Sequence, residues 1–375
     1  MEKVSGHKIS CLIALNLIGS FIVLGSSEAQ QDSWIAMTAA IALSLLLAWL
    51  YSAILRLHPG ENMFRIFTDV LGNTGGKVVS GLYAGYAIFL GARIVAIYIN
   101  FIQIVNLDNT PLAALLLLSM PMEAWFVKGG LKSMSNCAKF LYTFTVVLTI
   151  ATFLLGLPHM DLNNIKPVLA TAPGTLLRVT GGYLMLPLGE TVLCMSFFGE
   201  VDRKESPFRI LSVGILLGGV IVMTGILGNS LLLSAPVCRL FLFTTYQAIG
   251  IVSVGDFITR ISVIIGVEMT LTGFAKLGCF VYSASLGTSK VFGLKKFRGL
   301  VPSCCLLMAA LSLIFFRDIL TAVSFKTNIA EIGVPFQVVI PLAVLAVGKI
   351  RKARGKKKKA PVRKTAAVQS RVPEE

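Results

Sequence analysis

Apolar residues run through this 375-residue chain in long blocks separated by shorter polar connections. A helix needs about 20 residues to cross a hydrocarbon core of about 30 Å. The alternating segments of about 10 residues that are typical of a membrane β-barrel do not occur in the sequence. The pattern therefore predicts an all-α polytopic membrane protein with ten transmembrane helices, at about 10–26, 34–55, 77–106, 111–127, 138–157, 176–198, 208–233, 262–286, 300–316 and 334–348.

Two of the predicted spans are interrupted by glycine and proline. The first carries Gly19-Ser20 and then Gly25, and the sixth carries Gly181-Gly182 and then Pro187-Leu188-Gly189-Glu190. Lipid cannot satisfy the backbone N–H and C=O groups that a break exposes, so breaks persist where they line a cavity inside the protein. Paired breaks in corresponding positions of two halves point to a transporter-type binding site.

The broken spans are the first and the sixth, which divides the ten spans into five plus five. An odd number of crossings per half brings the second half in from the opposite face, so we expect an inverted repeat. The predicted domains are a transmembrane domain over residues 1–348 and a basic, disordered tail over 349–375. The alternative is a cleaved signal peptide at residues 1–29, which would leave nine spans and remove the paired breaks.

Basic residues fall mainly on one side of the predicted membrane. Of the 34 lysines and arginines, 26 lie on the side that holds both termini, six lie on the other side, and Arg93 and Lys276 lie inside spans. Cytoplasmic segments carry the excess of lysine and arginine. The distribution therefore predicts a multi-pass protein of the inner membrane with both termini in the cytoplasm.

Composition adds little to this picture of a membrane protein. The chain is 55% hydrophobic and 14% charged, with a mean hydropathy of +0.80, whereas soluble domains carry about 25% charged residues. The net charge of +16 mainly reflects topology, since the tail alone contributes +9. The run Lys356–Lys359 could hold anionic lipid head groups, but a solvated, disordered tail that reinforces the orientation is the favoured explanation. We expect no nucleic-acid partner.

Catalytic and metal-binding motifs do not occur in the sequence. Seven cysteines form no CxxC pair, and the three histidines, His7, His58 and His159, are too far apart to build a metal site by spacing. There is no phosphate-binding Gly-Lys-Ser/Thr loop, no GxSxG and no HExxH. We therefore predict a protein that is not an enzyme and holds neither a metal ion nor a cofactor.

Short motifs in a fixed order resemble the spore germination permease family over about residues 5–345. They are Ile9-Ser10, Gln31-Asp32-Ser33-Trp34-Ile35, Pro59-Gly60-Glu61-Asn62, Thr110-Pro111, Lys128-Gly129, Lys166-Pro167-Val168, Leu186-Pro187-Leu188-Gly189-Glu190 and Gly255-Asp256-Phe257-Ile258-Thr259-Arg260. The resemblance implies a leucine-transporter-type fold within the amino acid–polyamine–organocation superfamily. It also implies the inner membrane of the dormant spore and assembly with an A subunit and a lipoprotein C subunit.

In that family the B subunit is regarded as the sensor of a small nutrient germinant, often an amino acid. The resemblance therefore implies a germinant-sensing subunit built on a transporter scaffold. Two alternatives stay open: an amino acid transporter driven by protons or sodium ions, and a water or ion conduit gated by the same helices.

The candidate ligand-binding residues follow from the two breaks. Gly19, Ser20 and Gly25 would let the first span open, and the exposed helix end could hold a ligand carboxylate. A helix-packing face of small residues is the alternative explanation for the first span. Pro187, Gly189 and Glu190 form the second break, where the carboxylate could hold a ligand amine, carry a proton or lock the break in an ion pair.

Charged and polar residues inside other spans complete the candidate site. Arg93, Glu190, Glu268 and Lys276 form the predicted buried charge network, although the long stem of Lys276 favours an ammonium that snorkels to the interface. Thr272 lies one helical turn from both Glu268 and Lys276 and is assigned to the ligand site. Among Tyr83, Tyr86 and Tyr98, we select Tyr98 as the pocket residue, against a role in interfacial packing.

We expect a reporter fused after Glu375 to be active only as a cytoplasmic tag, because both termini lie on the basic side of the predicted topology. Paired alkaline phosphatase and β-galactosidase fusions measure this directly, with a fusion after Asp108, on the opposite predicted face, as control. Phosphatase activity from the Glu375 fusion would reject the ten-span topology.

Overall fold

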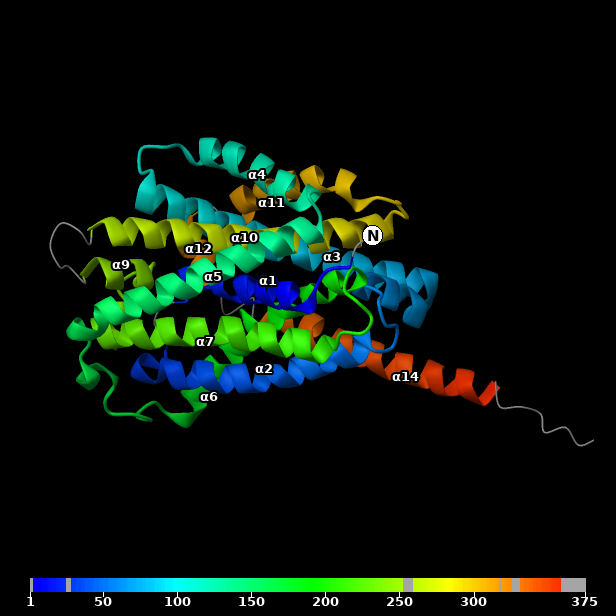
Figure 1. Ribbon diagram of the computed structural model, residues 1–375, viewed down its shortest axis with the longest axis horizontal. Helices are drawn as coiled ribbons and strands as arrows, with labels where there is room; N and C mark the ends of the chain where they lie inside the picture. Colours follow the sequence, from blue (N-terminus) through cyan, green and yellow to red (C-terminus); the bar gives the residue numbers. More distant parts are fainter. Residues whose placement is uncertain (1–2, 25–27, 252–258, 317, 326–330, 359–375) are drawn as a thin grey trace, which may run out of the picture.

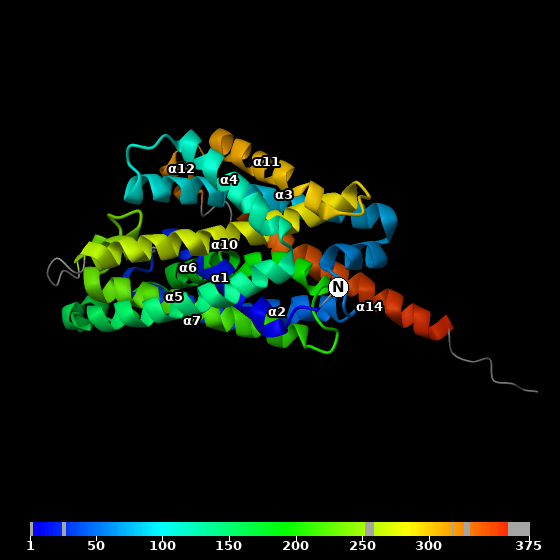
Figure 2. The ribbon, with the colours of Figure 1, turned by 45° about the horizontal axis from the view of Figure 1, so that its top comes forward.

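The computed structural model describes residues 3–24, 28–251, 259–316, 318–325 and 331–358. Within these ranges every regular element is helical, and Val4 and Val201 form an isolated β-bridge. The long helices run side by side along the longest axis of the molecule (Figure 1), and the turned view shows the same bundle (Figure 2). The prediction of an all-α fold is thus confirmed for the described residues.

The α-helices are α1 Gly6–Ile18, α2 Ser33–Leu55, α3 Met63–Asn106, α4 Leu112–Lys128, α5 Leu131–Gly156, α6 Pro173–Met185, α7 Pro207–Leu233, α8 Ala235–Cys238, α9 Thr244–Ile251, α10 Thr259–Val291, α11 Val301–Phe315, α12 Ile319–Ser324 and α14 Ile340–Lys358. Short 3₁₀-helices are η1 Phe21–Val23, η2 Gln30–Asp32, η3 Leu157–His159, η4 Leu162–Ile165, η5 Leu188–Gly199 and η6 Phe297–Gly299. The π-helical turn η7 Pro335–Val339 leads directly into α14. The N-terminal residues and the far end of α14 lie toward the same end of the bundle (Figure 1).

Length and apolar composition suit many of these helices to a membrane. In the described part of the chain, seven helical segments meet both criteria: Gln30–Leu55, Met63–Val105, Leu131–His159, Pro173–Gly199, Pro207–Leu233, Val263–Val291 and Glu331–Ala353. Gly6–Ile18 and Val301–Phe315 are shorter apolar helices. The chain is therefore a multi-pass membrane protein, whereas the count of ten spans and the inverted repeat stay predictions.

Both predicted helix breaks are present. The helix α1 ends at Ile18, and the chain continues through Gly19 and Ser20 into η1. The helix α6 ends at Met185, and the chain restarts as η5 after Leu186 and Pro187. Proline has no backbone N–H to donate, so the α-helical hydrogen-bond pattern stops here. The predicted break residue Gly25 lies outside the described residues.

The prediction that Gly181-Gly182 also interrupts the sixth span is wrong. Both glycines lie within α6, and the Gly182 carbonyl oxygen accepts a hydrogen bond from the Leu186 N–H at 2.8 Å. A Cβ atom at either position would meet no other atom within 4 Å. The two glycines lower helix propensity there, but neighbouring turns keep the helix intact.

Two predicted boundaries differ from the structure because helices extend beyond their apolar blocks. The helix α5 begins at Leu131 rather than near residue 138, since its first turns carry polar residues at the helix end. The predicted tail boundary at residue 348 falls inside α14, which continues to Lys358. Residues 359–375 lie outside the described part of the chain, so the disorder of the tail stays a prediction.

A kink at Gly72 divides α3 into a short first helix and a longer one that contains the predicted third span. Gly72 has φ 84° and ψ 175°, a backbone conformation open essentially only to glycine. The short helix before it is amphipathic, with Phe64 and Phe67 buried and Arg65 exposed. Asn62 accepts the Arg65 N–H at 3.0 Å and caps the start of this helix.

Two glycines of α7 allow α1 to approach closely. A Cβ atom at Gly218 would lie 2.7 Å from the Ala14 carbonyl oxygen, and one at Gly214 would lie 2.7 Å from the Ile13 Cβ. Small residues spaced by four bring membrane helices into close contact in this way. The packing holds the broken first span against α7.

We expect Gly218→Ala to reduce the stability of the protein by about 1–3 kcal/mol, because the new methyl group overpacks the α1–α7 contact. The matched control is Gly85→Ala in α3, where a Cβ atom would meet nothing within 4 Å. Thermal unfolding of both variants in lipid nanodiscs measures the difference. Equal stability of the two variants would contradict the close-packing assignment.

Candidate functional site

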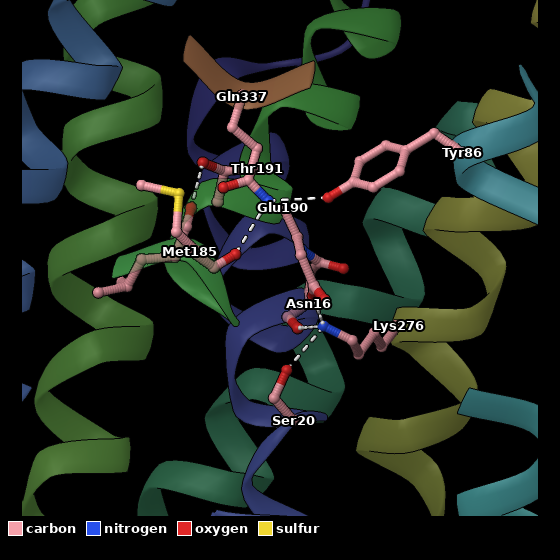
Figure 3. A network of polar contacts seen from close by, with 9 residues as sticks. Asn16, Ser20, Tyr86, Met185, Glu190, Thr191, Lys276 and Gln337 are labelled. Carbon is pink, nitrogen blue, oxygen red and sulfur yellow. Dashed lines mark hydrogen bonds and ion pairs between the residues drawn. The ribbon is translucent and has the colours of Figure 1, made fainter. Parts of the chain in front are cut away.

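A lysine of α10 lies between the two helix breaks. The Lys276 ammonium donates to Ser20 Oγ at 2.7 Å and to the Asn16 carbonyl oxygen at 3.1 Å, and it forms an ion pair with Glu190 Oε2 in η5 (Figure 3). Lys276 is 0% exposed and Glu190 1%. We call Asn16, Ser20, Glu190 and Lys276 the break cluster. It joins three segments that are far apart in the sequence.

The end of α1 creates an acceptor for this lysine. The Ser20 N–H donates to the Leu17 carbonyl oxygen at 3.1 Å, three residues back. In a continuous α-helix it would donate to Asn16, four residues back. The Asn16 carbonyl oxygen therefore lies outside the helical pattern and accepts from Lys276 instead. The break in α1 thus supplies a ligand for a cation.

Gly19 makes this approach possible. A Cβ atom at Gly19 would lie 2.6 Å from the Thr272 carbonyl oxygen and 2.8 Å from Lys276 Cβ. The end of α1 therefore rests directly on α10, and a larger residue would separate them. Thr272 itself donates its hydroxyl to the Met269 carbonyl oxygen at 3.0 Å, one turn back along α10.

Because the Lys276–Glu190 pair is buried, its stability depends on the hydrogen bonds around it. Two charges removed from water carry a large desolvation cost, which their attraction offsets only when further hydrogen bonds complete the site. Ser20 and the Asn16 carbonyl provide those bonds, and the ring of Phe280 lies 5.0 Å from the ammonium. The expectation that Lys276 snorkels to the interface is wrong, because its helical phase points it at the breaks.

The side-chain amide of Asn16 is the part of the break cluster whose hydrogen bonds are not satisfied by the described residues. It is 0% exposed, and neither its Nδ2 nor its Oδ1 has a hydrogen-bond partner among the described residues. A buried amide without partners costs about 1–3 kcal/mol. A donor and an acceptor therefore remain available directly beside the ion pair.

A second set of contacts ties η7 to the break in the sixth span. Gln337 Nε2 donates to Tyr86 Oη at 2.8 Å and to the Met185 carbonyl oxygen at 2.9 Å (Figure 3). The Tyr51 hydroxyl donates to the Gln337 carbonyl oxygen at 2.9 Å. A Cβ atom at Gly189 would collide with the Gln337 side chain and lie 3.0 Å from the Leu184 carbonyl oxygen. Gly189 is thus the contact point between the break and η7.

A cavity of about 70 Å³ lies beside the first break. Its lining includes Ile18 and Phe21 on either side of the break, and Glu268 and Thr272 on α10. Glu268 therefore lies near the breaks but outside the Lys276–Glu190 pair.

Arg93 occupies a different site. It is 2% exposed, and its Nε–H donates to the Ala322 carbonyl oxygen of α12 at 2.9 Å. Its Nη2 has no hydrogen-bond partner in the described ranges. In the predicted charge network, Glu190 and Lys276 form a direct ion pair, and Arg93 lies within electrostatic range of Glu190. Glu268 lines the cavity beside the first break.

The selected tyrosine also lies outside the break cluster. A Cβ atom at Gly273 would lie 3.0 Å from Tyr98 Cδ2 and 3.1 Å from Ile22 Cδ1, so the ring packs between α10 and η1. Tyr86 instead contacts Gln337, and its ring stacks on Phe336 with centroids 4.4 Å apart. The ligand-binding role of Tyr98 stays a prediction.

Sequence reasoning missed Asn16, Tyr51, Gln337 and Glu123. Asn16 and Gln337 are lone amides within apolar blocks, and Glu123 is a lone carboxylate within the predicted fourth span, so each carried the polarity signal that singled out Glu190. Tyr51 carried no comparable signal. Among the described residues, no group of three or more His, Cys, Asp or Glu could hold a metal ion.

Comparison with known proteins gives consistent family matches. A family model described as spore germination protein matches residues 3–320. Spore germination protein KB of Bacillus subtilis (strain 168) is 24% identical over 353 residues, which cover 93% of this chain and 95% of that protein. Spore germination protein A2 of the same organism is 23% identical over 295 residues, covering 76% and 79%.

Two solved structures with a similar fold are transporters. Mhp1, a nucleobase-cation-symport-1 family transporter in a closed conformation with bromovinylhydantoin bound, superposes with a TM-score of 0.71 at 12% identity, covering 92% of this chain and 78% of that chain. The Eremococcus coleocola manganese transporter gives a TM-score of 0.51 at 10% identity, covering 94% and 88%. The chain therefore has a transporter-like fold.

We expect Lys276→Met to lose about 3–5 kcal/mol of stability, because it leaves the Glu190 carboxylate buried without its cation. The double variant Lys276→Met/Glu190→Gln should recover most of that loss, since both charges are gone. Folded yield and thermal unfolding in nanodiscs measure both. Equal abundance of wild type, single and double variants would contradict the buried-pair assignment.

Proposed function

Because this chain belongs to the spore germination permease family, we propose that it senses a small nutrient, an amino acid, as the germinant-sensing subunit of a germinant receptor. It does so on a transporter scaffold of ten helices, in a five-plus-five inverted repeat whose first and sixth helices are broken. Its place is the inner membrane, with both termini in the cytoplasm and with A and C subunits as partners. The matched proteins are described as germination proteins and transporters, which agrees with a function other than catalysis.

The observation that supports this proposal is that one buried lysine bonds both breaks at once. The pair Lys276–Glu190 holds α10, η5 and the end of α1 together. A ligand that separates the pair releases these segments from one another. Ligand binding can then shift the bundle between two conformations, provided that the ligand binds one of them better.

The charges of the pair select the class of ligand. A ligand with one charge would satisfy one member of the pair and leave the other charge buried without compensation, which is strongly unfavourable. An amino acid zwitterion carries both charges, so its carboxylate can replace Glu190 on Lys276 and its ammonium can replace Lys276 on Glu190. Each buried charge then still has a partner of opposite sign.

Asn16 adds hydrogen bonds for the same ligand. Its amide lacks partners in the described chain and lies beside the pair, where it can donate to a carboxylate and accept from an ammonium. The cavity beside the first break is lined by Ile18, two residues from Asn16, and by Thr272, one helical turn from Lys276. We propose that the ligand reaches the pair from there.

Coupled transport is the alternative function, supported by the transporter-like fold. The oxygen atoms around Lys276, a backbone carbonyl, a hydroxyl and a carboxylate, are ligands that a hard cation such as sodium accepts. The ammonium already occupies the position that a coupling sodium ion would need among them. This favours the sensor over a sodium-coupled transporter.

We expect spores that carry Glu190→Gln to need at least about tenfold more amino acid for half-maximal germination, because a hydrogen bond to a charged group is worth about 1.5–3 kcal/mol. The experiment deletes the gene in its host, complements it with each variant, and tests single amino acids and sugars. The matched control is Glu331→Gln, the same chemical change at an exposed residue.

Ligand class is tested on the purified protein in nanodiscs. We expect alanine to raise the midpoint of thermal unfolding, whereas alaninamide, which lacks the carboxylate, and N-acetylalanine, which lacks the ammonium, should not. Radiolabelled alanine uptake in reconstituted vesicles tests the transporter alternative. Uptake driven by a sodium or proton gradient would reject the sensor, and equal responses to all three compounds would reject the zwitterion.

A further inference from the structure

A second buried carboxyl group lies outside the site described above. Glu123 of α4 is 0% exposed, and both its carboxyl oxygens lack a hydrogen-bond partner within the described residues. The same helix presents Leu117, Leu118, Met122 and Trp125 on its outer face, each more than 60% exposed. Glu123 therefore faces the protein interior from a helix whose other face is apolar and suited to lipid.

The packing of α10 makes room for this carboxyl group. A Cβ atom at Gly278 would lie 3.0 Å from Glu123 Oε1 and 2.9 Å from Phe126 Cε1. Glycine at this position thus lets α4 and α10 meet across the carboxyl group. Gly278 is two residues from Lys276, which turns it by about 200° around the helix. One side of α10 faces the break cluster, and the nearly opposite side faces Glu123.

The groups around Glu123 supply no positive charge. Cys279 of α10, Cys305 of α11 and Tyr98 of α3 are the titratable groups within electrostatic range of it. On α10, Lys276 is paired with Glu190, and Lys290 lies in the last turn, twelve residues from Gly278. Lys128, at the end of α4, acts on Cys305.

An ionised carboxylate in such surroundings has no compensation. Removing an unpaired charge from water costs many kcal/mol, whereas a neutral carboxylic acid costs far less. Sodium, calcium and magnesium ions require several oxygen ligands, whereas the groups named here are two thiols, one tyrosine, one phenylalanine ring and a glycine. A proton is the one ligand that these surroundings suit.

We infer that Glu123 is a proton-binding site that couples protonation to the packing of α4 against α10. The carboxyl group holds its proton while the two helices are packed, and it releases the proton when they separate and water reaches it. Low pH therefore favours the packed arrangement, and rising pH favours separation. Because α10 also carries Lys276, the proton at Glu123 and the contacts of the break cluster bias the same helix.

The first test is thermodynamic. The folded protein keeps a proton that the unfolded chain loses above the ordinary carboxyl range of about pH 4.3, so unfolding releases a proton and stability falls as pH rises. Glu123→Met keeps the length of the side chain and removes the proton site. We expect the unfolding constant of the wild type, divided by that of Glu123→Met, to rise by up to about tenfold per pH unit.

The measurement uses the full chain in nanodiscs, unfolded by denaturant between about pH 5 and pH 9, with Glu331→Gln as the matched exposed control. The control should follow the wild type. A constant ratio across this range would overturn the proposal, as would a ratio that falls with pH. The wild type and Glu123→Met are also compared in sodium chloride and in choline chloride. If sodium chloride stabilises only the wild type, the ligand of Glu123 is a metal cation and the proposal of a proton is overturned.

The second test does not depend on stability. Infrared spectroscopy of the folded wild type at neutral pH should show the C=O stretch of a protonated carboxyl group, and Glu123→Gln should lack that band. If Glu123→Gln folds poorly, Glu123→Met, which also lacks the carboxyl group, supplies the same comparison. Spectra with only ionised carboxylates would overturn the proposal.

Discussion

An ammonium group inside a membrane protein needs oxygen atoms around it, and Lys276 obtains them from both broken segments. The break after Ile18 frees the Asn16 carbonyl and presents Ser20, and the break at Pro187 presents Glu190. The other close contacts follow from this need: Gly19 lets α1 touch α10, and Gly214 and Gly218 hold the same helix against α7. The breaks and the lysine stabilise one another, because either alone would leave polar groups unsatisfied.

The parts of this arrangement that rest on local chemistry could be predicted from the sequence. Proline and glycine within apolar blocks identified the breaks near Gly19 and Pro187, since those residues act on their own turn of helix. The same rule failed at Gly181-Gly182, where the surrounding turns keep α6 continuous. Helix ends were less predictable than helix centres, because α5 and α14 extend into polar sequence.

The parts that rest on helix rotation could not be predicted. Whether Lys276 reaches the interface or the interior depends on which way its turn of α10 faces. Glu268, Thr272 and Lys276 share one side of this helix, but the sequence does not show what that side faces. Arg93 and Glu268 lie in spans as predicted, but their neighbours come from α12 and from the cavity beside η1. Asn16, Glu123 and Gln337 carried a sequence signal, since each is polar within an apolar block, but their partners are set by three-dimensional packing.

The Gln337 contacts give α14 a mechanical property. The helix from Ile340 to Lys358 is about 28 Å long at 1.5 Å per residue, and its first turn follows the residue that contacts Met185, Tyr86 and Gly189. If this helix tilts as a rigid body, it pivots where Gln337 contacts the break in the sixth span. A tilt of about 10° around that point would displace the Lys358 end of α14 by about 5 Å, roughly half the diameter of a helix. Because α14 also packs on α2 and α3, with Val344 and Leu345 buried, such a tilt would have to carry those contacts with it toward the end of the bundle where the N-terminus lies.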